Sequence, residues 1–505
     1  MNERTPEADV CLILEGTYPY VSGGVSTWTQ DLILAQPDMN FHLVALLPVQ
    51  ADLTPRYRIP DNVVGITHVV VQRLPPGRPS LPQSDKLFER LQEPLLRLQS
   101  HGGLAEVAAV LELLAPHRSR LGSRLLLNSL DAWEMLLRMY RASQPESSFL
   151  DFFWTWRGLL GGLYSILLAD LPKALVYHAI STGYAGLMVA RAHLETGRPV
   201  LVTEHGIYTT ERRIEISMAD WLYEAQPGGL QIDKPGRSLK DLWVDTYVSY
   251  SRACYDACSR IITLYEGNQR SQIEDGAAPE KLAIIPNAID EEHYSAVRPA
   301  SGPRPPTVAL IGRVVPIKDL KTFIRAVGIL REIVPDLEAL ILGPTEEDQD
   351  YYRDCKTLVS HLALQRTVSF AGKVNLLDYL GRIDAIALTS ISEAQPLVIL
   401  EAGAVGIPTV ATDVGACREM ILGRRQESPA LGPGGAVTPL SNPTATAQEL
   451  AKLLTDREWY HRCSRAIRTR VSLYYNKTDL NRSYRELYET YRAVPGPALS
   501  IGGKV

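Results

Sequence analysis

Short hydrophobic runs recur along the chain, and most are followed by a polar or glycine-rich turn and then by a segment with helical periodicity. A continuous hydrophobic run of this kind is typical of a strand buried on both faces of a parallel sheet. Strands that alternate with helices predict an α/β fold. The expected strands are Val10–Leu14, Phe41–Leu47, Val63–Val71, Ala174–His178, Val200–Thr203, Arg260–Tyr265, Thr307–Ile311, Ala339–Gly343, Val368–Gly372, Ile386–Leu388, Ile407–Ala411 and Gly434–Val437.

One long segment, about residues 74–171, breaks this alternation. Its hydrophobic residues recur at helical spacing in three amphipathic blocks, LFERLQEPLLRLQ, LAEVAAVLELLAP and LDAWEMLLRMYRA. We therefore expect a helical insertion in the N-terminal half of the chain, with the aromatic cluster between Phe149 and Trp156 in its core. Such an insertion can cover a ligand cleft, bind a partner or serve packing alone, and the pattern is compatible with all three.

The length of 505 residues indicates at least two domains. The run of proline and charged residues from Arg298 to Pro306 is typical of an interdomain linker. We expect an N-terminal domain over residues 1–297, a second α/β domain over residues 298–478 and a final helical segment over residues 479–505.

Composition narrows the class of protein. With 45% hydrophobic and 22% charged residues the chain is ordinary for a globular protein, and its formal charge of −5 argues against a general role with nucleic acid. The six cysteines form no CxxC pair, which argues against a zinc site and favours a reduced, cytoplasmic environment. The polar N-terminus does not resemble a signal peptide, and no hydrophobic run reaches the roughly 20 residues that span a bilayer.

The stretch from Leu388 to Asp413, LTSISEAQPLVILEAGAVGIPTVATD, is the most informative part of the chain. Its polar turn ends at Pro396, and proline is favoured in the first turn of a helix. Gly406 and Pro408 end that helix, and the next hydrophobic run follows. We therefore expect a strand, a loop, a helix and a second strand of one parallel sheet.

Two carboxylates, Glu393 and Glu401, lie in the loop before this helix and about one turn inside it. Between them the free amides of Leu397 and Val398 can bind an anion. The arrangement suits a nucleotide sugar, with the diphosphate on the amides and the carboxylates on ribose and sugar hydroxyls. A surface loop with two solvated glutamates is the alternative.

Two cationic residues, Arg313 and Lys318, lie between the expected strand Thr307–Ile311 and the helix after it. Together they can supply two positive charges to a diphosphate. Unrelated surface charges are the alternative at these positions.

Asp348 and Asp350 form a DxD triplet, an arrangement that holds a divalent ion in metal-dependent glycosyltransferases. Here the triplet lies in an acidic run that leads into a helix, and acidic residues favour a helix N-terminus without any metal. We therefore expect no metal site.

A glycine-rich segment, EGTYPYVSGGVS, follows the first expected strand and contains Gly16, Gly23 and Gly24. Glycine lets the backbone approach a ligand closely. The spacing is not GxGxxG and no convincing acidic partner follows on a second strand, which argues against a nicotinamide site. A ligand-binding loop and a structural turn both fit the segment.

Two histidines, His178 and His205, lie at the ends of expected parallel strands. Open α/β sheets bind ligands at the carboxyl ends of their strands. His205 is therefore favoured as a site residue, whereas His178 fits a site role and a structural role equally well.

The pair Glu393 and Glu401, with seven residues between them, followed by the Gly-x-Pro segment at 406–408, resembles the signature of the retaining glycosyltransferases of family 4. Arg313 and Lys318 also match the pattern of that family. These enzymes have the GT-B fold.

The resemblance is greatest to the PelF-type enzymes of bacterial exopolysaccharide synthesis, through the helical insertion and the segment EHGIYTTERR. The chain departs from the family pattern after Glu393, where Ala394, Gln395 and Pro396 stand in place of the usual Gly-Phe-Gly. Because Pro396 has no amide hydrogen, one expected phosphate donor is absent.

The resemblance implies a GT-B architecture of two Rossmann-like, doubly wound domains that face a cleft, with a C-terminal helix that returns to the first domain. It implies a metal-independent, retaining hexosyltransferase. Such an enzyme moves glucose or a related hexose from UDP-glucose or another UDP-hexose to a growing exopolysaccharide, here the Pel polysaccharide of biofilms.

The resemblance also assigns roles to residues. His205 is expected beside the transferred sugar, and Glu393 and Glu401 are expected on the hydroxyls of the sugar and of the ribose. The implied catalytic residues are His205, Glu393, Arg313 and Lys318. The implied UDP-sugar-binding residues are Gly23, Gly24, Arg313, Lys318, Glu393, Leu397, Val398 and Glu401.

The expected partners are the UDP-sugar donor, an oligo- or polysaccharide acceptor and, by resemblance, an inner-membrane polysaccharide synthase complex that holds the cytoplasmic protein at the membrane. No cofactor other than the donor is expected. Three other classes remain open at this point. They are a UDP-sugar 2-epimerase, a non-catalytic UDP-sugar-binding component of a synthase complex, and a sugar phosphorylase.

Overall fold

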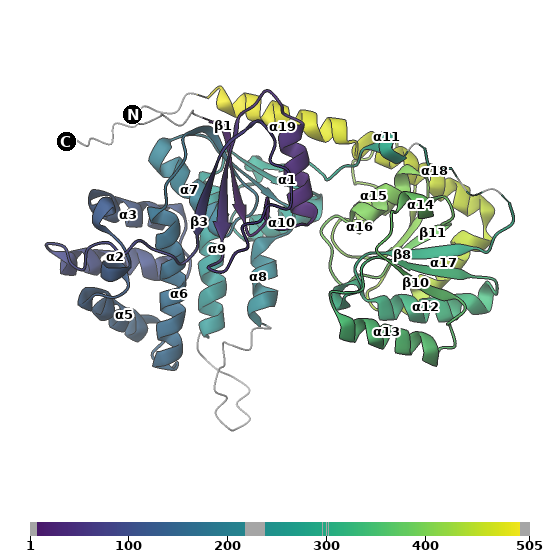
Figure 1. Cartoon of the computed structure of the whole chain (residues 1–505), viewed down its shortest axis with the longest axis horizontal. Coiled ribbons are helices and arrows are strands. Elements are labelled where there is room, and N and C mark those ends of the chain that lie inside the picture. The colour runs from purple at the N-terminus through teal and green to yellow at the C-terminus, as the bar shows by residue number, and fades with distance from the viewer. Residues whose placement is uncertain (1–7, 218–237, 295, 299, 301, 495–505) are drawn as a thin grey trace. The chain divides into compact units, whose positions relative to one another are not determined.

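The computed structural model describes the chain except for residues 1–7, 218–237, 295, 299, 301 and 495–505. The backbone forms two compact units, and each is built around one parallel sheet covered by helices (Figure 1). The first unit comprises residues 1–263, 268–284 and 484–505, and the second comprises residues 264–267 and 285–483.

The sheet of the first unit has the strand order β3-β2-β1-β4-β5-β6-β7, and every neighbouring pair is parallel. The chain starts in the middle and winds first to one edge and then to the other, which is the doubly wound arrangement. Strand β7 was not predicted, and its three residues are only half-buried. The strands are β1 (Ala8–Glu15), β2 (Phe41–Leu47), β3 (Val63–Val70), β4 (Ala174–Ala179), β5 (Val200–Glu204), β6 (Arg260–Thr263) and β7 (Leu282–Ile284).

The sheet of the second unit repeats this winding with the strand order β10-β9-β8-β11-β12-β13, again all parallel. Its central strands are buried, as the hydrophobic runs predicted, apart from the half-buried Ile311 at the end of β8. The strands are β8 (Thr307–Ile311), β9 (Glu338–Leu342), β10 (Val368–Gly372), β11 (Ala385–Leu388), β12 (Thr409–Thr412) and β13 (Gly435–Thr438).

Helices connect the strands and cover the sheets in both units. In the first part of the chain they are α1 (Gly24–Leu34), α2 (Ser84–Leu98), α3 (Leu104–Leu114), α4 (Ser123–Leu126), α5 (Leu130–Ser143), α6 (Phe149–Leu168), α7 (Tyr184–Thr196), α8 (Tyr208–Ser217), α9 (Leu239–Ala257) and α10 (Glu266–Glu274). In the second part they are α11 (Glu291–Tyr294), α12 (Leu320–Ile333), α13 (Gln349–His361), α14 (Leu377–Leu380), α15 (Leu397–Ala404), α16 (Cys417–Leu422), α17 (Pro443–Thr455), α18 (Arg457–Tyr474) and α19 (Lys477–Arg492). Short 3₁₀ turns add η1 (Ala115–Arg120), η2 (Pro279–Lys281) and η3 (Pro316–Lys318).

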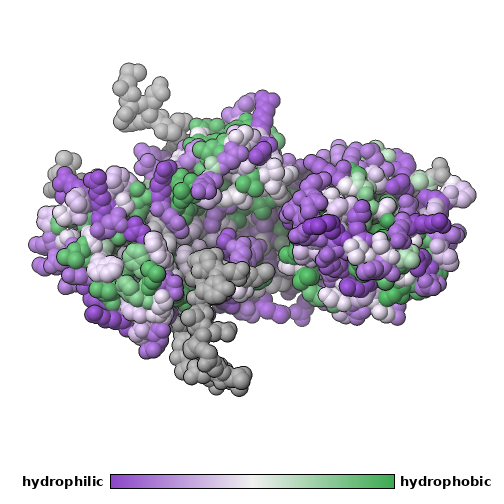
Figure 2. Space-filling view, turned by 60° about the horizontal axis from the view of Figure 1, so that its bottom comes forward, coloured by the Kyte–Doolittle hydropathy of each residue, from purple (hydrophilic) through white to green (hydrophobic). Residues whose placement is uncertain are grey.

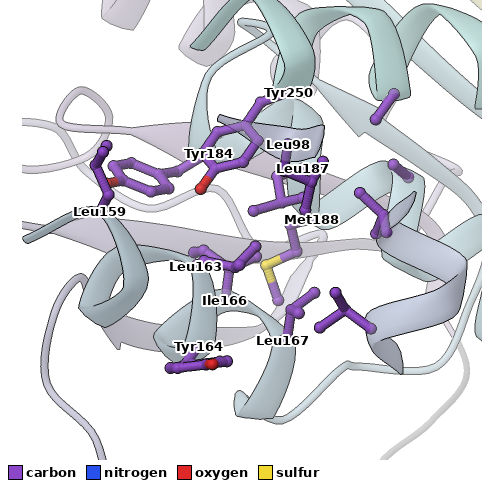
Figure 3. Packing of buried hydrophobic residues seen from close by; sticks show 14 of the residues in the cluster. Leu98, Leu159, Leu163, Tyr164, Ile166, Leu167, Tyr184, Leu187, Met188 and Tyr250 are labelled. Atoms are coloured by element: carbon purple, nitrogen blue, oxygen red, sulfur yellow. The ribbon is translucent and has the colours of Figure 1, made fainter. Parts of the chain in front are cut away.

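Helices α2 to α6 form the helical insertion between β3 and β4. Figure 3 shows Leu163, Ile166 and Leu167 of α6 packed toward Leu187 and Met188 of α7, and all of these side chains are buried. The insertion therefore shares one hydrophobic core with the sheet of the first unit and does not form a separate domain.

The aromatic cluster of α6 is only partly in that core. Phe152 and Trp156 are buried as expected, but Trp154 is 60% exposed. Hydrophobic residues lie among hydrophilic ones on the molecular surface seen in Figure 2. No helix in the described ranges is both long and apolar enough to cross a bilayer.

The boundary between the units differs from the expected one at residue 298. The compact units divide after Ile284, because the residues that follow pack with the second unit. Ile289 is buried in its core, and the amide of Asn287 donates to Gln395 Oε1 at 2.7 Å. The proline-rich stretch lies within the residues of the second compact unit.

Helix α19 contributes to both units. Its residues from Tyr484 onward belong to the first unit, where Tyr484 and Tyr488 are fully buried. The hydroxyl of Tyr488 lies 2.8 Å from His178 Nδ1, and Arg485 forms an ion pair with Asp38. The core of the first unit is thus completed by α19, the last helix that the structure describes.

Candidate functional site

The loops after β8 and β11 lie against each other at the carboxyl ends of the second sheet. The amide of Ile391 donates to the carbonyl of Ile317 at 2.9 Å, and the hydroxyl of Thr389 donates to the carbonyl of Asp319 at 2.9 Å. These bonds tie the two loops together at the place where open α/β sheets bind ligands.

Lys318 and Glu393 form an ion pair between these loops. Lys318 Nζ donates to Glu393 Oε1 at 2.5 Å, and Ser390 Oγ donates to the same oxygen at 2.6 Å. The side chains of Lys318 and Glu393 are 22% and 12% exposed, so the pair is shielded from solvent yet open to a ligand. The structure thus brings together two predicted site residues and adds Ser390, whose place three positions before Glu393 was the available signal.

Arg313 does not join this pair. Its Nη1 donates to Glu347 Oε1 at 2.5 Å, and both side chains are about half exposed. The two cations expected on one diphosphate therefore have separate carboxylate partners in this structure, with Arg313 on Glu347 and Lys318 on Glu393.

Glu401 lies inside α15 and faces α11. The hydroxyl of Tyr294 donates to Glu401 Oε1 at 3.2 Å. Burial raises the pKa of the Glu401 carboxyl above its usual range, while the Tyr294 hydroxyl and the charge of His293 act in the opposite direction. Sequence reasoning missed Tyr294, because nothing in its local pattern pointed to the helix that carries Glu401.

Helix α15 begins as the sequence predicted, with Pro396 as its N-cap and Leu397 as its first residue. The amides of Leu397 and Val398 belong to the first turn, whose N–H groups have no intrahelical acceptor. Leu397 is 38% exposed, so this helix end is accessible.

The residues that replace the usual Gly-Phe-Gly hold the loop in place. Gln395 is buried and accepts the amide of Asn287, and the carbonyl of Ala394 accepts the amide of Ala416 at 2.8 Å. Gly415 has a φ of +51°, and a Cβ there would collide with the carbonyls of Glu393 and Ala394. The loop with Glu393 is therefore fixed from two sides.

In the first unit, His205 lines a small cavity at the carboxyl ends of β1, β4 and β5. The cavity has a volume of about 180 Å³. His205 stacks edge-on against Trp28 at 4.6 Å between ring centroids. Burial lowers the pKa of His205 to about 4, so the imidazole is neutral at neutral pH.

Polar atoms with unused hydrogen-bonding capacity converge on this cavity. Within the described part of the chain, four buried atoms of its lining have no hydrogen-bond partner: Thr17 Oγ1, Ser181 Oγ, His205 Nε2 and Arg212 Nε. Buried polar groups are nearly always paired, so a cluster of this kind is suited to a ligand with several hydroxyl groups.

Glu15, at the end of β1, is a further acidic residue of this cavity that sequence reasoning missed. It accepts the hydroxyl of Tyr208 at 2.8 Å and the amide of Ala185 at 3.2 Å. Burial raises the pKa of Glu15, and these hydrogen bonds and the charge of Arg212 act in the opposite direction. Its signal was its place directly after a buried strand.

Gly23 and Gly24 lie at the start of α1, and both are exposed. A Cβ at either position would meet no atom within 4 Å. The surrounding protein therefore does not require glycine there, and a close approach of ligand to this backbone remains a prediction.

His178 has a structural environment. Its Nδ1 lies 2.8 Å from the hydroxyl of Tyr488, and its Nε2 lies 2.9 Å from Thr203 Oγ1. Because both ring nitrogens are used inside a fully buried site, this residue belongs to the core of the first unit.

Two families match the chain. Residues 8–280, more than half of the chain, match the family described as "Domain of unknown function (DUF3492)". The chain belongs to this DUF3492 family. Residues 296–470 match the family described as "Glycosyl transferases group 1", so the second unit of this DUF3492 protein carries a glycosyltransferase group 1 domain.

Curated relatives are similar over part of their length. The D-inositol 3-phosphate glycosyltransferase of Paenarthrobacter aurescens is 30% identical over 152 residues, which are 28% of this chain and 37% of the relative. The enzyme of the same name from Stackebrandtia nassauensis is 29% identical over 196 residues, which are 36% of this chain and 42% of the relative. The chain thus spans about two fifths of the length of these relatives.

Solved structures are similar over nearly the whole chain. The Anabaena protein HepE in complex with UDP has a TM-score of 0.58 and 14% identity, with 95% of this chain and 99% of that chain covered. Sucrose-phosphate synthase from Thermosynechococcus elongatus has a TM-score of 0.56 and 15% identity, with 95% and 98% covered. With its two parallel Rossmann-like sheets, the DUF3492 protein therefore has the GT-B fold.

In the group 1 domain the DxD triplet contributes to a helix start. Asp348 is the N-cap of α13 and accepts the amide of Tyr351 at 2.9 Å, and Asp350 pairs with Arg353. In the ranges that the structure describes, no group of three or more His, Cys, Asp or Glu residues is placed to hold a metal ion.

Proposed function

We propose that this DUF3492 protein is a retaining glycosyltransferase that moves glucose or a related hexose from a UDP-sugar to a growing exopolysaccharide. The observation that supports it best is the Lys318–Glu393–Ser390 cluster at the strand ends of a glycosyltransferase group 1 domain, beside the open N-terminus of α15. This arrangement combines a cation, oxygen acceptors and free amides in one place.

The proposed chemistry begins with an exchange of partners. The donor diphosphate takes the place of Glu393 as the partner of Lys318, and the released carboxylate of Glu393 then accepts hydrogen bonds from the sugar hydroxyls. When the bond between the anomeric carbon and the phosphate breaks, negative charge develops on the leaving UDP. Lys318, Arg313 and the amides of α15 stabilise that charge.

Glu401 is proposed to hold the ribose of the donor. Its carboxylate receives one hydrogen bond from Tyr294 and has acceptor capacity left for ribose hydroxyls. The role of Tyr294 is to orient that carboxylate.

The choice of UDP is supported by structural neighbours that were solved with UDP or UDP-glucose. Crystals of Anabaena HepE contained UDP, UDP and glucose, or UDP-glucose. Because these neighbours are only 14% identical to this chain, they establish its fold and not its donor, which remains a proposal.

The neutral His205 and the polar cavity around it are proposed to receive sugar hydroxyls in the first unit. A neutral imidazole can accept or donate a hydrogen bond without the free-energy cost of burying a charge. The hydroxyl oxygens of Thr17 and Ser181, which have no partner among the described residues, can add further hydrogen bonds. We propose that the reaction needs no metal ion, because cationic side chains and helix amides stabilise the negative charge of the diphosphate.

Within the glycosyltransferases, we propose that the protein is one of the PelF-type enzymes of Pel polysaccharide synthesis. In that role the protein lies in the cytoplasm and is held at the inner membrane by a polysaccharide synthase complex. The resemblance of the segment EHGIYTTERR and the presence of the helical insertion support this assignment.

Product analysis separates the candidate functions. The protein is incubated with UDP-glucose, UDP-galactose or UDP-N-acetylglucosamine in EDTA, with and without a saccharide acceptor, and products are followed by NMR. Transfer with the donor's α configuration kept in the product is expected. Epimerised UDP-sugar without acceptor would support a 2-epimerase, and UDP binding without turnover would support a non-catalytic component.

A further inference from the structure

A second, larger cavity lies in the first unit, where the helical insertion meets the sheet. Its volume is about 850 Å³, within the range of cavities that bind drug-sized ligands. Helix α6 of the insertion supplies one wall, and α8, α9 and the residues after β3 supply the others. None of the roles proposed above uses this cavity.

The lining combines aromatic faces with arginines. Trp154 from α6 is 60% exposed, and Trp243 and Tyr247 from α9 also line the cavity, with their rings stacked at 6.0 Å between centroids. Arg73 and Arg157 add guanidinium groups. Such a surface fits a ligand that has apolar ring faces and many oxygen acceptors.

Arg212 joins this cavity to the smaller one around His205, because it lines both. Its Nη1 donates to Glu215 Oε2 at 2.6 Å, and its buried Nε has no partner among the described residues. The two cavities therefore adjoin at this side chain.

We propose that the large cavity binds an oligosaccharide, the part of the acceptor that precedes its reacting end. This inference rests on the proposed glycosyl transfer. Sugar rings have an apolar face that stacks on Trp154 and hydroxyl groups at their edges that accept from Arg157 and Arg212 and donate to Glu215. Glu215 offsets the charge of Arg212, and its carboxylate oxygens accept hydrogen bonds from saccharide hydroxyls, which an ionised phosphate has no proton to donate.

The binding test uses saturation-transfer NMR of the full chain with cellotetraose, maltotetraose and chitotetraose as probes. At least one tetrasaccharide is expected to bind, and Trp154→Ala and Arg157→Gln should each weaken its affinity by about tenfold or more. Leu150→Ala and Arg141→Gln are the matched controls, because both residues lie in the insertion outside the cavity lining and should leave the affinity unchanged.

UDP affinity, measured by calorimetry on the same variants, keeps this inference separate from the proposed function. Unchanged UDP affinity with weakened tetrasaccharide binding supports the inference. The inference is overturned if the protein binds UDP but no tetrasaccharide. It is also overturned if both cavity variants bind the tetrasaccharide as tightly as the wild type does. Either result leaves the proposed donor site unaffected. Weaker UDP binding in Trp154→Ala would overturn it in favour of a nucleotide site, and a folded protein that binds neither ligand contradicts both proposals.

Discussion

At the scale of residues, the proposed donor site depends most on the ion pair of Lys318 with Glu393. Lys318→Ala should weaken UDP affinity roughly tenfold to a hundredfold, because a charge-assisted hydrogen bond contributes about 1.5–3 kcal/mol. Calorimetry gives the affinity. Lys321→Ala is the matched control, since Lys321 pairs with Asp354 on α13 instead. Equal UDP affinity in wild type and Lys318→Ala would remove the phosphate role of Lys318.

The buried His178 makes stability depend on pH. Burial lowers its pKa to about 3, far below the ordinary value of 6.5, so the unfolded chain binds more protons than the folded chain between these values. Stability is therefore lost as the pH falls below 6.5. Between pH 7 and pH 5 the wild type should lose roughly 2 kcal/mol more unfolding free energy than His178→Gln. Urea unfolding at both pH values measures this, and identical losses would contradict the assignment.

Single residues of the candidate site were predictable from sequence where their chemistry is local. Lys318 and Glu393 follow hydrophobic runs that fix the ends of two neighbouring strands, and the structure brings their side chains together. The residue Tyr294 and the contact of Gln395 with Asn287 were missed, because these contacts come from segments distant in sequence. The pairing of Arg313 with Glu347 was not predictable either, since both side chains are half exposed and their choice of partner depends on loop geometry.

At the scale of elements, the packing of α15 on α18 depends on one glycine. A Cβ at Gly403 would lie 2.8 Å from side-chain atoms of Ile467 and Val471, closer than side chains pack. Gly403→Ala should therefore lower the melting temperature, with a cost of about 1–3 kcal/mol.

Gly328→Ala is the matched control within the same unit. Gly328 lies in α12, and an added Cβ there would make ordinary contacts at 3.8 Å with two leucines. Because alanine is favoured over glycine inside helices, this change should be neutral or stabilising by up to about 1 kcal/mol. Scanning calorimetry compares the two variants, and equal melting temperatures would contradict the packing argument.

Elements with a strong hydrophobic pattern were the ones that sequence reasoning predicted well. The three amphipathic blocks correspond to α2, α3 and α5, and the twelve expected strands all lie at observed strands. The short edge strand β7 was not predicted; it has three half-buried residues and pairs with β6. Local periodicity predicts elements, whereas edges of a sheet are set by tertiary pairing.

At the scale of the whole molecule, residues of α19 complete the hydrophobic core of the first unit, whose sheet begins with β1. Tyr488→Ala should destabilise the first unit by about 3–5 kcal/mol, because it empties a buried site and leaves His178 Nδ1 without its partner. Hydrogen exchange in β1 and β4 measures this loss. Glu486→Ala, an exposed change in the same helix, should leave the exchange unchanged. Equal protection in both variants would contradict a structural role for the last helix.

The division of the chain into units was less predictable than its elements. A proline-rich stretch usually marks a boundary, but here the residues before it, including Ile289, are buried in the second unit. The helical insertion was predictable as helical from its periodicity, but its merger with the core of the first unit follows from tertiary contacts between α6 and α7.

The central claim is that the group 1 domain binds a UDP-sugar between Lys318, Glu393 and Glu401, and calorimetric titration tests it most directly. UDP, ADP and GDP are titrated in EDTA into the wild type, Glu401→Gln and the exposed control Glu332→Gln. The account predicts that UDP binds more tightly than ADP or GDP, that Glu401→Gln loses at least about tenfold in UDP affinity, and that Glu332→Gln loses none. A folded wild type that binds none of the three nucleotides, or binds them equally and regardless of Glu401, would contradict it.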